Sequence, residues 1–196
     1  MILNLLLEAK MLFTKEQLHL MMPDATEKNV NKFVLPLNAA MEEFKIVKPL
    51  QIAAFIAQIA HESYNLHYVE EIASGANYEF RKDLGNLEFE ALQAAHANYT
   101  TTGKFYKGRG LIQITGYYNY KACGTALKVD LITNPKLLSE EVYACRSAAW
   151  FWDSNRLNSY ADLGKFALIT KRINGGTNGS KERLANYTRC KKILEC

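Results

Sequence analysis

Acidic side chains in one short region of the chain could carry out proton-transfer chemistry. The segment AQIAHESYNLHYVEE, residues 57–71, begins like a buried helix and places Glu62 where this helix should end. A carboxyl group at such a position is partly removed from water, which raises its pKa and keeps it able to donate a proton near neutral pH. Glu62 is therefore a candidate general acid, although a helix-terminal glutamate without a catalytic task explains this position equally simply.

A second carboxylate for a glycosidase pair could come from the acidic residues that follow within the next 21 positions: Glu70, Glu71, Glu79 and Asp83. An inverting glycosidase holds its two carboxyl groups roughly 6.5–9.5 Å apart, so that a water molecule fits between the base and the sugar. A helix end and a loop facing it across a cleft can provide this separation. Considered locally, Glu70 and Glu71 are more simply explained as a solvated charge pair.

The spacing around His61 disfavours a metal site. A zinc-protease helix needs H-E-x-x-H, with both histidines on one helix face, but the fourth residue after His61 is Asn65. The cysteines form no C-x-x-C pair and have no histidine at zinc-finger spacing: Cys123, Cys145, Cys190 and Cys196. We therefore expect reduced thiols, no metal and no organic cofactor.

A second chemically rich segment is KFYKGRGLIQITGYYNY, residues 104–120. Sugars stack on aromatic rings and form hydrogen bonds through their hydroxyl groups, so this mixture of polar and aromatic side chains suits a saccharide. A turn and strand that only support the core is the alternative. Alternating residues predict a short strand over residues 110–115. A phosphate-binding loop is disfavoured, because no lysine follows Gly116.

Most of the remaining chain has the periodicity of amphipathic helices. We expect helices over residues 14–22, 26–44, 48–63, 139–154, 163–173 and 180–194. Thr14 and Gln17 form a potential capping box, and Pro36 is expected to kink or split the second helix. Residues 75–116 have weak periodicity, and such long irregular segments are usually functional. The sequence predicts a mainly α domain with a long irregular central segment and at most a small β element.

The length of 196 residues suits one domain, and no linker or repeat interrupts it. We predict a single catalytic domain over residues 1–196, with residues 1–11 as an N-terminal extension. The start, MILNLLLEAKMLF, lacks a basic beginning and a cleavage site, so we expect no signal peptide and synthesis in the cytoplasm. No apolar run is long enough to predict a membrane span.

The formal net charge of +4 favours a polyanionic neighbour such as a wall polymer or a membrane surface. No block of Lys and Arg is present, so nucleic acid is disfavoured as a partner. The C-terminal stretch SKERLANYTRCKKILEC could contact an anionic envelope, although a solvated basic helix face is the simpler interpretation.

Four ordered motifs resemble glycoside hydrolase family 19, the chitinase-like and lysozyme-like hydrolases: FIAQIAHES, YVEEIASGANYEFRKDLGN, FYKGRGLIQITGYYNY and KRINGGTNG. The likeness covers residues 12–194 and is greatest to the short phage and bacterial endolysins. It implies a lysozyme-like fold, Glu62 as general acid and Glu71 as general base, with Glu70 as the fallback and Glu79 as a weaker candidate. It further implies that Thr115 holds the attacking water. The implied substrate-binding positions are His61, Gln113, Tyr118, Asn119, Asn174 and Arg183.

The chain departs from the family pattern at two places near the implied cleft. HANYTTTG lacks the Gly-Asp-Gly often found before the F/Y-x-GRG motif, and Phe80 stands where a glycine is common. These departures affect the loop shape and with it the choice of substrate.

We expect a monomeric peptidoglycan hydrolase that cleaves β-1,4 bonds of the glycan strands by inverting acid/base catalysis and causes bacterial lysis from the periplasm. A chitinase that uses the same carboxylates is the nearest alternative. A non-catalytic wall-binding module is the alternative of another class.

Overall fold

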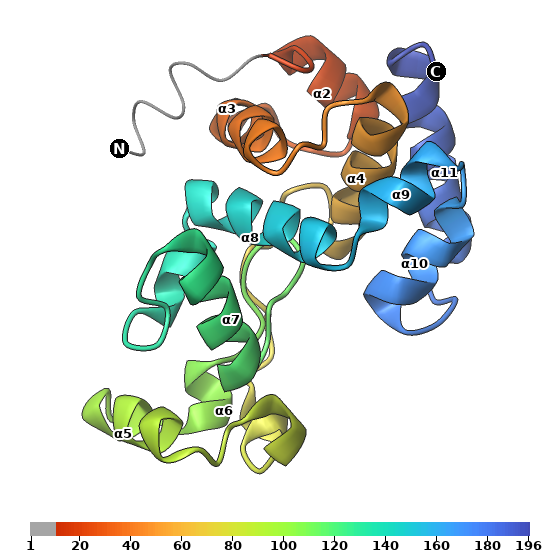
Figure 1. Ribbon diagram of the computed structural model, residues 1–196. Coiled ribbons are helices and arrows are strands. Elements are labelled where there is room, and N and C mark those ends of the chain that lie inside the picture. Colours follow the sequence, from red (N-terminus) through yellow and green to blue (C-terminus); the bar gives the residue numbers. More distant parts are fainter. Residues whose placement is uncertain (1–10) are drawn as a thin grey trace.

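The periodic segments form α-helices in the computed structural model, which describes residues 11–196 (Figure 1). The longer helices are α2 (Lys15–Met21), α3 (Glu27–Glu43), α4 (Pro49–Glu62), α5 (Phe89–Ala97), α7 (Tyr117–Leu127), α8 (Glu141–Ser154), α10 (Phe166–Asn174) and α11 (Ser180–Ile193). Shorter elements are α6 (Thr102–Phe105), α9 (Leu157–Asp162), η1 (Ala76–Tyr78), η2 (Lys82–Leu84) and η3 (Pro135–Ser139). The expected mainly α class is confirmed. The helices α5, α6, α7 and α9 are elements that the sequence periodicity did not indicate.

The prediction of a strand over residues 110–115 is wrong. The described residues contain no sheet, and this region makes only isolated bridges, Glu70 to Arg109 and Arg109 to Ile114. The Arg109 and Ile114 backbones exchange hydrogen bonds of 3.1 and 2.8 Å. Gly110 and Gln113 between them have φ angles of 81° and 58°, so the chain reverses instead of extending.

Local signals at the N-terminal helices have mixed outcomes. The Thr14 hydroxyl accepts from the Gln17 backbone, and the Gln17 side chain accepts from the Thr14 backbone, so the capping box is confirmed. Pro36, in contrast, does not split α3, which continues to Glu43. Pro36 lies on the buried face, and packing of that face supports the helix despite the lost backbone donor.

Helix α4 lies at the centre of the core. Every residue from Gln51 to Ala60 is buried, including the polar Gln58. A helix that is buried all round must be covered on several sides, and α4 packs against α11 and α9, whereas α8 packs against α3. The acid candidate Glu62 is therefore the last residue of a helix that is buried over most of its length.

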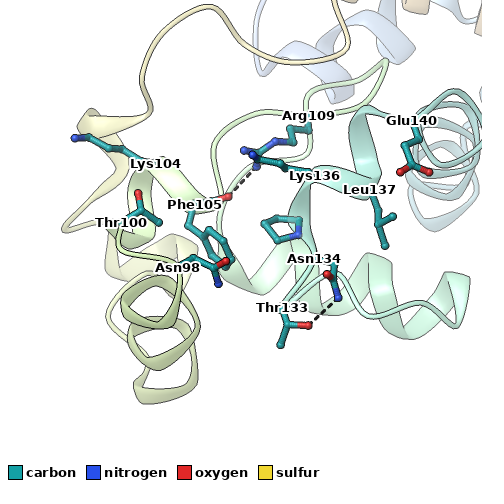
Figure 2. A pocket seen from close by; sticks show the side chains of 11 residues that line it. Asn98, Thr100, Lys104, Phe105, Arg109, Thr133, Asn134, Lys136, Leu137 and Glu140 are labelled. Carbon is teal, nitrogen blue, oxygen red and sulfur yellow. Dashed lines mark hydrogen bonds between the residues drawn. The ribbon is translucent and has the colours of Figure 1, made fainter.

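The central region forms the lower part of the molecule in Figure 1, where α5 and α6 lie below α7. A cavity of about 420 Å³ opens here between α6 and η3 (Figure 2). No helix among residues 11–196 is long and apolar enough to cross a membrane. The four cysteines are free thiols, and burial raises the pKa of the Cys123 thiol to about 12.

Candidate active site

Glu62 is held by an arginine that comes from the other end of the chain. Its Oε1 atom accepts a hydrogen bond of 2.6 Å from Nη2 of Arg183 on α11. The Nη1 atom of Arg183 donates to Oε1 of Gln58 at 2.5 Å, one helical turn before Glu62. The Gln58 amide donates in turn to the Thr170 hydroxyl at 2.8 Å. A buried polar chain thus links Glu62 on α4 with α11 and α10.

The surroundings of Glu62 combine partial burial with a neighbouring positive charge. Its side chain is 21% exposed, so the carboxyl group is partly removed from water as expected. It nevertheless faces a guanidinium that is itself only 3% exposed. Arg183, expected to bind substrate, therefore lies in the interior and contacts Glu62. Gln58 was missed, although a lone polar residue in the apolar run of α4 was a usable signal.

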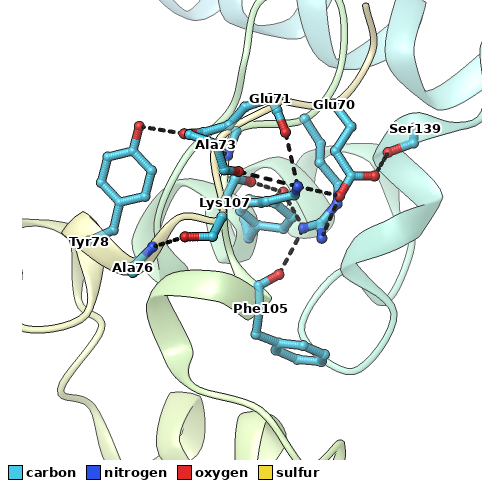
Figure 3. A network of polar contacts seen from close by, with 12 residues as sticks. Glu70, Glu71, Ala73, Ala76, Tyr78, Phe105, Lys107 and Ser139 are labelled. Atoms are coloured by element: carbon cyan, nitrogen blue, oxygen red, sulfur yellow. Dashed lines mark hydrogen bonds and ion pairs between the residues drawn. The ribbon is translucent and has the colours of Figure 1, made fainter.

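Both carboxylate oxygens of Glu71 accept hydrogen bonds, and these bonds hold the side chain against Gly108. Oε2 accepts from the Gly108 backbone N–H at 2.8 Å, and Oε1 accepts from the Tyr78 hydroxyl at 3.2 Å. Lys107 Nζ donates to the Glu71 backbone carbonyl at 2.9 Å, which holds the backbone of Glu71 in place (Figure 3). Burial and the adjacent carboxylate of Glu71 raise the pKa of Tyr78, so its hydroxyl remains a donor.

The neighbourhood of Gly108 brings Glu71 together with two side chains from the second motif. A Cβ atom placed on Gly108 would lie 2.7 Å from Oε1 of Gln113, 3.0 Å from Oε2 of Glu71 and 3.3 Å from Oγ1 of Thr115. Three polar groups thus converge on a position that has room only for glycine. A water molecule beside Thr115 would be within reach of the Glu71 carboxylate.

Glu70 points away from Glu71 and toward cations (Figure 3). Its Oε1 atom lies 3.0 Å from Lys107 Nζ and 3.3 Å from Arg109 Nη2. The Ser139 hydroxyl donates to Oε2 at 3.4 Å. Burial opposes ionisation of Glu70, but the hydrogen bond from Lys107 and the charge of Arg109 outweigh it and lower the pKa of Glu70. This glutamate closes a salt-bridge network.

The other acidic candidates also have structural partners. The Glu79 carboxylate accepts from the Thr102 hydroxyl at 3.3 Å and from the Gly103 backbone at 3.2 Å, which joins η1 to α6. Asp83 accepts from Arg81 at 2.7 Å. Neither contacts the groups around Gly108.

Glu62 and Thr115 line the same cavity of about 200 Å³. Gln113 and Asn119 add polar groups to this cavity, and its apolar walls are formed by Leu84, Ile112, Ile114, Trp150, Phe151 and Ile173. The Thr115 hydroxyl donates to the Gln113 carbonyl at 3.0 Å, which leaves its oxygen as an acceptor. A carboxyl group, a hydroxyl and two amides therefore face one small space with apolar walls.

Residues 39–187 match the family model of glycoside hydrolase family 19, described as "Chitinase class I". The chain belongs to glycoside hydrolase family 19. An endochitinase of Arabidopsis thaliana is 36% identical over 146 residues, which cover 74% of this chain and 46% of that protein. A glycosyl hydrolase family 19 domain-containing protein of Haemophilus influenzae is 31% identical over 172 residues, which cover 77% of this chain and 84% of the relative.

Solved family 19 structures agree with this assignment. Chitinase C from Streptomyces griseus superposes with a TM-score of 0.75 at 26% identity, over 94% of this chain and 77% of that one. A bacterial family 19 chitinase gives a TM-score of 0.71, also at 26% identity, over 93% of this chain and 95% of that one. The chain spans less than half the length of the plant relative above. The resemblance noted from the motifs and the lysozyme-like fold are confirmed.

The remaining substrate-binding candidates of this family 19 chain lie in different settings. Asn119 donates from Nδ2 to the Thr115 carbonyl at 2.7 Å, so its Oδ1 atom is available at the cavity. The Tyr118 hydroxyl donates to Glu88, and the ring lies against Gly85 beyond η2. Asn174 donates to the Asn178 carbonyl at 2.9 Å. The His61 Nδ1 atom lies 2.9 Å from Glu182.

Proposed function

We propose that this family 19 chain is an inverting glycoside hydrolase that cleaves β-1,4 bonds between N-acetylated amino sugars, acts as a monomer and uses peptidoglycan as its substrate. The observation that carries the catalytic proposal is the cavity shared by Glu62 and Thr115, with Glu71 beside Thr115 at Gly108. This arrangement supplies an acid and a base with a site for water next to the base.

The proposed reaction uses side chains already held in position. Glu62 protonates the glycosidic oxygen of the leaving sugar, and Arg183 balances the negative charge that then remains on the carboxylate. Glu71 takes a proton from a water molecule that the Thr115 hydroxyl orients, and this water attacks the anomeric carbon from the opposite face. Because Gly108 and Tyr78 hold one Glu71 oxygen each, the base is oriented before substrate arrives.

Two observations support peptidoglycan as the substrate, namely the endolysin-like motif set and the net charge of +4, which favours an anionic polymer. The wall lies in the periplasm, where we propose that the chain acts. Chitin is the second candidate substrate, and the endochitinase and chitinase relatives favour it.

Digestion of purified peptidoglycan and of chitin oligosaccharides, followed by mass spectrometry of the products, decides between these substrates. We expect new reducing ends at the glycan bonds of peptidoglycan and an inverted anomer by NMR. Release of sugars from chitin alone would establish the chitinase instead. Binding to the wall without turnover of either polymer would favour the non-catalytic module.

Glu62→Gln tests the assignment of the acid. We expect a loss of at least about 100-fold in lysis of outer-membrane-stripped cells, because general acid catalysis contributes on the order of 10²–10⁴. The same change at Glu16, an exposed glutamate of α2, is the matched control and should leave lysis unchanged. Full lytic activity of Glu62→Gln would contradict the mechanism.

A further inference from the structure

The cavity between α6 and η3 is separate from the proposed catalytic cleft. It has about twice the volume of the cavity beside Glu62, about 420 against 200 Å³, and the two have no lining residue in common. The proposed mechanism therefore assigns it no role. Its walls combine neutral polar groups with apolar ones, and Figure 2 shows Phe105 and Asn134 among the side chains that surround it.

Three charged residues that lack ion-pair partners in the described structure line this cavity, and Figure 2 shows the Lys104 ammonium group at its outer edge. Lys104 and Lys136 line it, and neither ammonium group forms an ion pair or hydrogen bond with any of residues 11–196. Glu140 supplies one carboxylate, likewise without an ion-pair partner among these residues. Two free ammonium groups against one free carboxylate make a site that suits a ligand with more carboxylates than ammonium groups. A neutral oligosaccharide could form hydrogen bonds with these three groups but would give none of them an ion-pair partner.

A buried arginine beside the cavity provides an independent observation. Arg109 is 3% exposed, donates from Nη1 to the Phe105 carbonyl at 2.7 Å (Figure 2) and pairs through Nη2 with Glu70 at 3.3 Å. Its Nε atom has no hydrogen-bond partner in the described part of the chain. Buried donors normally have an acceptor, and Arg109 lines the cavity, so it leaves an unsatisfied cationic donor in the wall of this site.

The neutral side chains of the cavity indicate what carries the carboxylates. The Thr133 hydroxyl already donates to Asp130 and accepts from Asn134, and the Asn98 amide donates to the Ala94 carbonyl. The second amide hydrogens and the carbonyl oxygens of Asn98 and Asn134, with the Thr100 hydroxyl, still offer donors and acceptors that match the N–H and C=O groups of a peptide backbone. Phe105 and Pro135 offer apolar contacts for small side chains. The position of Thr133 is fixed because its backbone N–H donates to Asp130 at 3.0 Å.

The geometry points to a binding site for a short acidic peptide, of the kind that the stem peptides of peptidoglycan present, with carboxylates at Lys104 and Lys136 and an ammonium group at Glu140. The choice of stem peptides rests on the proposed function, whereas the preference for an acidic peptide rests on the cavity alone. Such a site would hold the cross-linked wall while the separate cleft acts on the glycan.

The test uses the full chain and a peptide without sugar, so that the catalytic cleft is not involved. The probe is the N-acetylated tetrapeptide Ala-isoGlu-diaminopimelate-Ala with free carboxylates, titrated by NMR and calorimetry. We expect shifts at backbone amides of residues 98–105 and 133–140. The variant Lys104→Gln/Lys136→Gln should weaken binding at least about tenfold, because it removes both cationic partners of the carboxylates.

The matched control is Lys28→Gln/Lys165→Gln, which removes the same charge from two exposed lysines outside the cavity and should change Kd less than about twofold. If both double variants weakened peptide binding equally, the effect would be general electrostatic attraction, and the proposed binding site would be wrong. Equal binding of the fully amidated peptide, shifts of the same amides by chitotetraose, or the absence of binding at millimolar peptide would also overturn it. Hydrolysis of peptidoglycan is measured separately, so failure of the proposed function leaves the peptide result interpretable.

Discussion

At the scale of single residues, Glu70 and Glu71 show how neighbouring carboxylates acquire opposite environments. Successive side chains of an extended segment point to opposite sides, and the bridge between Glu70 and Arg109 shows that the segment is extended here. Glu70 consequently faces Lys107 and Arg109, whereas Glu71 faces Gly108 and Tyr78. This alternation suits a stabilising role for Glu70 and the catalytic role proposed for Glu71.

Glu70→Gln should destabilise the fold in a pH-dependent way. It leaves buried Arg109 without its carboxylate, and we expect a loss of about 1–2 kcal/mol in the free energy of unfolding at pH 7. This is below the roughly 3–5 kcal/mol of fully buried pairs, because the Glu70 side chain is 36% exposed. The pKa of Glu70 is lowered in the folded state, so its contribution is present above the pKa of the unfolded chain.

This contribution is lost as the pH falls through the lowered pKa of folded Glu70. The difference between the wild type and Glu70→Gln should therefore shrink on acidification. Urea unfolding at pH 7 and pH 3 measures it. A difference that stays constant or grows at pH 3 would show that the ion pair is not its cause.

Tyr78→Phe tests the orientation of the base. It removes one hydrogen bond to Glu71, while Gly108 still holds the other oxygen. We expect kcat to fall about tenfold, because a hydrogen bond to a charged group contributes about 1.5 kcal/mol, with little change in KM. Tyr99→Phe, at a side chain that is 99% exposed, is the control. An unchanged kcat for Tyr78→Phe would remove Tyr78 from the positioning of Glu71.

At the scale of elements, the packing of α11 against α4 holds the Glu62 side chain in place. Helix α11 brings Arg183 to Glu62, and it starts directly after Gly179. Gly179 has a φ of 68°, and a Cβ atom there would lie 2.4 Å from Cε1 of His61. The position thus needs glycine both for its backbone conformation and for the approach of the histidine ring.

Gly179→Ala should therefore lower both stability and activity. We expect a loss of more than about 1 kcal/mol in the free energy of unfolding, since alanine is strained at positive φ, and a further loss from the clash with His61. Gly164→Ala is the matched control, because Gly164 has a φ of 66° with nothing within 4 Å of the added Cβ. Thermal unfolding and a lysis assay compare the two. If both variants lost the same stability and kept the same activity, the contact with His61 would be unimportant.

At the scale of the whole molecule, the basic charge is distributed differently from the basic helix face expected at the C-terminus. Arg183 is turned inward to Glu62, and Arg189 donates to the Asn186 side chain at 3.0 Å. Lys191 lies over the Tyr187 ring at 5.2 Å. Lys181 and Lys192 remain as the exposed cations of α11. The basic surface that α11 could present to an anionic envelope is therefore smaller than the sequence indicated.

The net charge of +4 predicts salt-sensitive action on whole cells. We expect lysis to slow several-fold between about 10 and 150 mM salt, as the Debye length shortens from roughly 30 to 8 Å. Hydrolysis of short soluble oligosaccharides should change much less, because it does not depend on attraction to a charged surface. Equal salt sensitivity in the two assays would place the effect in the catalytic step.

Much of the architecture was predictable from local sequence signals. The helices α2, α3, α4, α8, α10 and α11 follow apolar periodicity and capping residues within single segments, and the ordered motifs around Glu62, Gly108 and Asn174 indicated the family. The weakly periodic helices α5 and α7 were missed, because their formation depends on packing partners from other segments. The turn at residues 110–113 was mistaken for a strand, because alternation does not reveal a left-handed backbone at Gln113.

The sequence by itself determined the helical class, the family and the presence of several acidic residues soon after α4, since these depend on residue types and short spacings. Only the tertiary structure decided that Glu71 lies beside Thr115 and Gln113, that Glu70 pairs with Arg109, and that Arg183 supports Glu62. Each of these environments depends on a contact between residues at least 37 positions apart in the sequence. Glu71 and Gly108 are separated by 37 positions, and Glu62 and Arg183 by 121. Periodicity describes one segment at a time, whereas the environment of a carboxylate is set by whatever distant segment packs against it.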